Sequence, residues 1–98
     1  MILQRVVFQA KFGHVNEVVA EMKQMMATMG REFNTQSRIL TDLSGPQFTV
    51  VLETVGESLA EWERTRLELF SRPDFQANFA RIIPLIEHGH TEFYTIEA

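Results

Sequence analysis

Two histidines and two glutamates lie close together near the C-terminal end of the chain, in the segment IEHGHTEFY at residues 86–94. Imidazole and carboxylate groups bind metal ions and transfer protons, so this segment could hold a metal or a catalytic base. A zinc site, however, needs several ligands in a defined geometry, and histidines two residues apart in a turn point in different directions. We therefore expect no metal site. His88 is interpreted as the last residue of a helix that Gly89 ends, and His90 as the start of a strand.

A second group of residues suited to chemistry comes from strand-like segments along the whole chain. Charges that are shielded from water must be paired or neutralised, so Arg and Glu residues on one sheet face could simply fix two subunits in register. Alternatively, they could orient the polar group of a ligand. In that case Glu53 is the candidate catalytic base and Tyr94 a hydrogen-bond donor, and the ligand-binding residues are Arg5, Arg38 and Glu92.

The single tryptophan, Trp62, is the remaining candidate for ligand binding. It lies on the apolar side of an expected helix, where a tryptophan commonly packs in the core. It could also form the wall of a cavity between the sheet and the helices, because its large ring offers both apolar surface and one hydrogen-bond donor. Both interpretations remain open at this point.

Hydrophobic periodicity and turn residues predict the elements that position these side chains. Strands are expected at residues 2–10, 38–43, 48–55 and 91–97, and the first helix from residue 15 to Gly30, which should end it. Ser58 and Glu61 form a capping-box pattern, so a second helix begins near residue 59. Pro73 should open a second piece of this helical region, and Pro84 predicts an irregular last turn.

The predicted order is strand, helix, strand, strand, helix, strand, which is that of an α+β ferredoxin-like fold with an antiparallel sheet. The chain of 98 residues has room for one such domain, residues 1–98. Successive strand residues point to opposite faces, and one of the two sets is apolar or small and should pack on the helices. This set contains Val6, Phe8, Ala10, Ile39, Phe48, Val50, Leu52 and Phe93.

The opposite face of the sheet carries the five charged and tyrosine residues named above, but it is too apolar to face water. A solvated sheet face usually alternates to polar residues, whereas the apolar side chains here would expose on the order of several hundred Å². The simplest cover is the same face of a second copy, so the sequence predicts a homodimer formed through the sheet faces. The apolar residues are Leu3, Val7, Leu40, Val51, Val55 and Ile96.

Composition excludes several classes of function. The net charge is −4 and the nine Lys and Arg residues are scattered, so nucleic acid is not an expected partner. The absence of cysteine excludes disulfides, thiolate metal sites and cysteine nucleophiles. Gln4 and Arg5 interrupt the apolar N-terminal segment before a signal peptide or a membrane span could be completed, so we expect a cytoplasmic protein with no membrane partner.

Three segments carry a resemblance to a known superfamily: VFQAKFGHVNEVV, SGPQFTVVLETVGESLAEWE and FARIIPLIEHGHTEFYTIE. They resemble the dimeric α/β-barrel superfamily, and most closely its small bacterial NIPSNAP-like and antibiotic-biosynthesis-monooxygenase-like (ABM-like) members. The resemblance covers nearly the whole chain and implies two ferredoxin-like subunits that close a β-barrel by packing their sheets together. Haem-degrading relatives use an asparagine on the first strand, where this chain has Gln4 and Gln9, so the resemblance disfavours that activity.

The resemblance implies no single activity, and the sequence contains no nucleophile elbow, phosphate loop or metal signature. We expect a protein that binds a small apolar or aromatic ligand between sheet and helices, or a protein partner, and that needs no cofactor. The alternative is a cofactor-independent monooxygenase, or an isomerase, that acts on an aromatic polyketide-like substrate.

Overall fold

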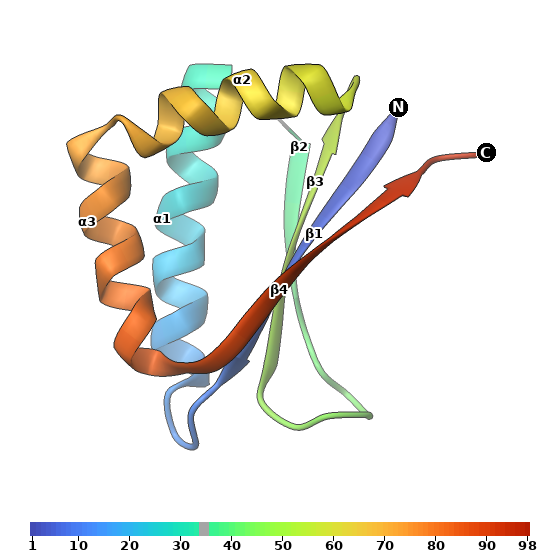
Figure 1. Cartoon of the computed structure of the whole chain (residues 1–98). Coiled ribbons are helices and arrows are strands. Elements are labelled where there is room, and N and C mark those ends of the chain that lie inside the picture. Colours follow the sequence, from blue (N-terminus) through green and yellow to red (C-terminus); the bar gives the residue numbers. More distant parts are fainter. Residues whose placement is uncertain (34–35) are drawn as a thin grey trace.

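The computed structural model describes residues 1–33 and 36–98, which form one layer of sheet and one layer of helices (Figure 1). The fold is α+β and ferredoxin-like, as predicted, and the second helical region is split in two. In chain order the elements are β1 (Ile2–Ala10), α1 (Val15–Phe33), β2 (Gln36–Thr41), β3 (Thr49–Gly56), α2 (Leu59–Phe70), α3 (Pro73–Ile82), the 3-10 turn η1 (Ile83–Leu85) and β4 (Ile86–Thr95). None of the helices described is long and apolar enough to cross a membrane.

The four strands form one antiparallel sheet in the order β2-β3-β1-β4. Its register places Arg5 of β1 opposite Glu53 of β3 and opposite Glu92 of β4. Arg38 of β2 lies opposite Glu53 from the other side. A shift of one residue would exchange the two faces of a strand, so the apolar set that packs on the helices fixes this register.

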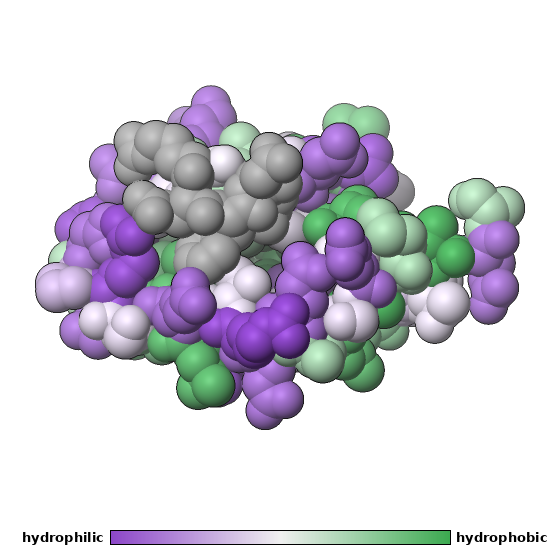
Figure 2. Space-filling view, turned by 90° about the horizontal axis from the view of Figure 1, so that it is seen from above, coloured by the Kyte–Doolittle hydropathy of each residue, from purple (hydrophilic) through white to green (hydrophobic). Residues whose placement is uncertain are grey.

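The hydrophobic core lies between the sheet and the three helices. Phe8, Val50 and Leu52 contribute from the strands, and the methionine stripe of α1 faces them, with Met22 fully buried. This confirms the predicted inward face of the sheet, except that Phe93 stays 39% exposed near one end of β4. Seen from above, hydrophobic side chains also reach the surface on the side of the molecule that carries the two termini (Figure 2).

The expected start of α2 near residue 59 is confirmed, with one of the two hydrogen bonds of a capping box. The side-chain oxygen of Ser58 accepts a hydrogen bond from the backbone N–H of Glu61 at 3.1 Å, which satisfies one of the free donors at the helix start. Pro73 lies in the first turn of α3, and Pro84 lies in the 3-10 turn that follows, also as predicted.

Both predicted glycine helix stops are wrong. Helix α1 continues through Gly30 to Phe33, because one glycine costs a helix only about 1 kcal/mol and the neighbouring turns outweigh it. Gly89 lies inside β4, which begins at Ile86 directly after the proline turn. His88 is therefore not a helix C-terminus, and His90 lies in the middle of the strand rather than at its start.

Gly89 has a packing role in place of the predicted capping role. It pairs with Phe8 across β1 and β4, and a Cβ atom at this position would lie 2.5 Å from Cδ1 of the Phe8 ring. Only glycine lets this ring lie against the backbone of β4, so the residue is required by the core and not by a turn.

Candidate functional site

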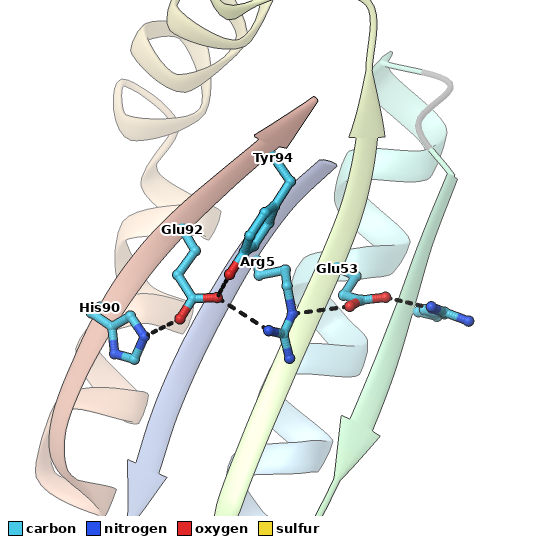
Figure 3. A network of polar contacts seen from close by, with 6 residues as sticks. Arg5, Glu53, His90, Glu92 and Tyr94 are labelled. Carbon is cyan, nitrogen blue, oxygen red and sulfur yellow. Dashed lines mark hydrogen bonds and ion pairs between the residues drawn. The ribbon is translucent and has the colours of Figure 1, made fainter. Parts of the chain in front are cut away.

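A line of charged side chains crosses the sheet on the face opposite the helices, which is called the open face below (Figure 3). The most buried member of the two central pairs is Glu53, whose side chain is 8% exposed. Glu53 Oε2 lies 3.0 Å from Arg5 Nε, and Oε1 accepts a hydrogen bond from Arg38 Nε at 2.6 Å. Each carboxylate oxygen of Glu53 is therefore engaged by a guanidinium group, one from β1 and one from β2.

Glu92 of β4 forms the second half of this line. Its Oε2 lies 2.7 Å from His90 Nε2, and its Oε1 accepts hydrogen bonds from Tyr94 Oη at 2.9 Å and from Arg5 Nη1 at 3.1 Å. The hydrogen bond to His90, then that to Tyr94, and the nearby charge of Arg5 lower the pKa of Glu92 below its ordinary value of 4.5. Glu92 is thus a carboxylate at neutral pH.

Strand alternation explains how distant segments build this line. Side chains of directly opposite residues on antiparallel strands lie close together, so the register that buries the apolar face also brings the arginines and glutamates into contact. The structure brings together all five residues predicted for the open face: Arg5, Arg38, Glu53, Glu92 and Tyr94. His90 also belongs to the line and was missed, although the alternation that places Glu92 and Tyr94 on this face extends two residues further back.

The geometry of the open face favours ion pairing over proton transfer. A general base must have an oxygen available to the proton that it removes. Oε1 of Glu53 accepts a hydrogen bond from Arg38, and Oε2 lies at ion-pair distance from Arg5 without a hydrogen bond from its Nε. Arg38 and His90, at the two ends of the line, have side chains that are 71% and 53% exposed. Arg38 and His90 can therefore bind a further polar group. Glu53, which contacts Arg5 and Arg38, is instead suited to holding β1, β2 and β3 together.

Trp62 lies on the other side of the sheet and forms part of a separate site. A cavity of about 480 Å³ lies between the sheet and α2, and Trp62 is on its wall. The indole ring contacts the ring of Phe93 edge to face, with centroids 4.8 Å apart. The structure therefore does not bring Trp62 together with the other five predicted residues.

The cavity wall is mainly apolar, with contributions from the sheet and all three helices. Its polar side chains include Gln4 and Thr54 from the strands and Thr65 from α2. The apolar side chains include Ile2, Val6, Phe8, Met25, Met29, Leu52, Leu69, Phe70, Phe75, Phe79 and Ile83. Sequence reasoning named only Trp62 as a candidate cavity residue and assigned Val6, Phe8 and Leu52 simply to the core. The spacing of Trp62, Arg66 and Phe70 on α2 already indicates one shared helix face.

No protein-family model and no curated protein matches the chain. Solved structures do match it over nearly its full length. An uncharacterised NIPSNAP domain protein from Burkholderia xenovorans is 22% identical with a TM-score of 0.86, and the match covers 100% of this chain and 96% of that one. A NIPSNAP family protein from Agrobacterium tumefaciens is 18% identical with a TM-score of 0.85, covering 96% and 90%.

A further match is SnoaB from Streptomyces nogalater, described as a cofactor-independent oxygenase. It is 13% identical to the chain with a TM-score of 0.76, and the match covers 99% of this chain and 93% of that one. Identities this low establish the fold and not the activity. The chain therefore shares the fold of the NIPSNAP family and of the antibiotic-biosynthesis-monooxygenase-like proteins, and the resemblance seen in its sequence is confirmed at that level.

Proposed function

We propose that the protein binds a small apolar or aromatic ligand in the cavity between the sheet and the helices. The observation that carries this proposal is the cavity itself, which has a volume of about 480 Å³ and a mainly apolar wall. Ligand pockets commonly have volumes of about 300–1,000 Å³ and an apolar wall with a few polar groups.

The polar groups on the wall are suited to orienting a ligand rather than to reacting with it. Gln4, Thr54 and Thr65 offer amide and hydroxyl groups, and Glu61 is the only carboxylate among the lining residues of the described chain. Glu53, the predicted base, is not among the residues that line this cavity, although its neighbours Leu52 and Thr54 are. Its side chain instead pairs with Arg5 and Arg38 on the open face. The cofactor-independent oxygenase alternative therefore loses its leading catalytic residue, and ligand binding is the function that the geometry supports better.

We also infer that the protein is a homodimer formed through the open face of the sheet. Of the six apolar residues predicted to need cover on this face, Leu3, Val7, Leu40 and Val55 are only partly buried in the single chain and Ile96 is 39% exposed. Val51 is already buried without a second copy, and Val55 also borders the cavity. A second copy would cover the residues that are still exposed, and would also exclude water from the line of ion pairs centred on Glu53. Covering a charged line is tolerable only when its members are paired, and the contacts of Glu53 and Glu92 meet this condition.

The ligand proposal is tested by calorimetric titration of the full chain with 1-naphthol, a neutral aromatic probe. We expect saturable binding with one site per chain. The variant Thr65→Phe, which adds a ring to the cavity wall, is expected to weaken binding by about tenfold or more. Its control is Glu63→Phe, which places the same ring on the exposed side of α2, outside the cavity, and should leave the affinity unchanged. Absence of saturable binding to the wild type, or equal affinity for both variants, would contradict the proposal.

The dimer proposal is tested by sedimentation velocity over a range of concentrations. We expect a dimer for the wild type. The variant Val7→Asp would place an unpaired carboxylate in the covered face and is expected to give a folded monomer. A wild type that stays monomeric at high concentration would exclude the dimer.

A further inference from the structure

Arg66 occupies an unusual position at the rim of the cavity. It lies one helical turn from Trp62 and one from Phe70 on α2, and all three residues line the cavity. Its guanidinium carbon is 5.8 Å from the centroid of the Trp62 ring and 5.4 Å from that of the Phe70 ring. Both distances are in the range of cation–π contacts, so the two rings hold the cation at the entrance.

Within the described part of the chain, Arg66 has no carboxylate at ion-pair distance. Arg5, Arg38 and Arg81 each pair with a glutamate, at distances of 3.0, 2.6 and 2.9 Å. Arg66 is also exposed to solvent, and its planar group keeps its hydrogen-bond donors free beside the aromatic rings. The side chain is therefore charged, oriented and available to an anion.

The other two titratable residues of the cavity wall have their own surroundings. Glu61 lies in the first turn of α2, where the helix N-terminus favours negative charge. The His90 ring is bonded to Glu92 on the open face, so its imidazole does not enter the cavity. Arg66 is thus the one cation that the described cavity wall presents to a ligand.

We propose that the ligand of this cavity is an amphipathic anion, with an apolar or aromatic body inside the cavity and a carboxylate paired with Arg66 at the rim. This inference rests on the proposed ligand-binding function and adds the chemical class of the ligand. An apolar pocket needs few polar contacts to fix the orientation of its ligand, and a guanidinium group can bind a carboxylate through two parallel hydrogen bonds. The aromatic rings reduce the freedom that Arg66 would lose on pairing, which favours binding.

The experiment compares decanoate with decanol, which have the same ten-carbon chain and differ in the charge of the head group. Affinities are measured by calorimetry, because the fluorescence of Trp62 would itself change when Arg66 is replaced. A solvent-accessible charge pair contributes up to about 1 kcal/mol, so decanoate is expected to bind the wild type about fivefold more tightly than decanol. The Arg66→Gln variant should remove this preference and leave decanol binding unchanged.

The matched control is Arg64→Gln, which removes the same charge from the same helix at an exposed position outside the cavity. It should keep the preference for decanoate. Raising the salt concentration should reduce the affinity for decanoate and not that for decanol, since exposed charge pairs are screened.

The possible outcomes separate the two proposals. If decanol and decanoate bind the wild type equally well, or if Arg66→Gln keeps the preference, the anionic class of ligand is wrong while the apolar site stands. If neither decanol nor decanoate binds, the ligand-binding function fails as well. If the Arg64→Gln variant loses the preference for decanoate to the same extent, the preference comes from the overall charge of the helix. That result would also overturn the role of Arg66.

Discussion

Replacing Gly89 by alanine is expected to destabilise the protein, because the new methyl group would overlap the ring of Phe8. The added carbon would lie 2.5 Å from Cδ1 and 2.8 Å from Cε1 of that ring. Carbon atoms pack at about 3.5–4.0 Å, so the ring would have to move by about 1 Å. Phe8 is only 7% exposed, so its ring could move only by giving up contacts in the core and entering the cavity that it also lines. The new methyl group would also lie 3.2 Å from the backbone oxygen of Val7, which cannot move aside as a side chain can.

Overpacking of this kind typically costs about 1–3 kcal/mol of unfolding free energy. The loss should appear as a lower urea midpoint at an unchanged slope of the unfolding transition. Gly30→Ala is the control, and it is expected to raise the unfolding free energy instead of lowering it. A Cβ atom at Gly30, within α1, would meet no atom within 4 Å, and alanine favours the helix by up to about 1 kcal/mol.

The shared contact can be isolated by a double-mutant cycle. Phe8→Ala removes both Cδ1 and Cε1, the atoms that the new methyl group would meet, so Gly89→Ala should cost less in the Phe8→Ala background than in the wild type. If Gly89→Ala leaves the unfolding free energy equal to or above that of the wild type, or if the two substitutions are additive, the packing explanation for this glycine is refuted.

Two further predictions concern the open face. The pKa of Glu92 is lower in the folded state than its ordinary value of 4.5, so its carboxylate adds stability that is complete above pH 4.5 and is lost as the pH falls through the folded pKa. The Glu92→Gln variant should therefore show a weaker fall of the urea midpoint at acid pH than the wild type. An unchanged profile would contradict the hydrogen bonds assigned to Glu92. Glu53→Gln leaves Arg5 and Arg38 without their shared carboxylate and is expected to lower the unfolding free energy by about 1–3 kcal/mol. The same variant should bind 1-naphthol as tightly as the wild type in calorimetry, since Glu53 lies outside the cavity; lost binding with intact stability would restore it as a ligand-binding or catalytic residue.

Most of what could be predicted about the open face follows from the alternation of side chains between the two faces of each strand. Once Arg5, Glu53 and Glu92 are assigned to the same side of neighbouring strands, the sheet register brings them into contact without further information. The capping pattern at Ser58 and the proline turns were equally local, and they too were predicted correctly. These features depend on residues that are adjacent in the chain or directly opposite in the sheet.

Other features depend on distances between layers, which no local pattern contains. Gly89 was predicted as a helix stop because glycine commonly takes that role, whereas its real constraint is the ring of Phe8 on another strand. Because the last strand was expected to begin at residue 91 rather than at Ile86, His90 was not assigned to the charged line. The cavity follows from the separation between α2 and the sheet, so Trp62 could be named as a candidate wall residue but its neighbours could not.

Strand β3 has a practical consequence for mutational scanning of this protein. Leu52 and Thr54 line the cavity, whereas Glu53 between them faces the other side. Substitutions at these three consecutive positions should therefore give alternating phenotypes. Changes at Leu52 and Thr54 should alter ligand affinity, whereas changes at Glu53 should alter the unfolding free energy and leave ligand affinity unchanged. Smoothing scan data over neighbouring positions would erase this alternation and merge two independent sites into one.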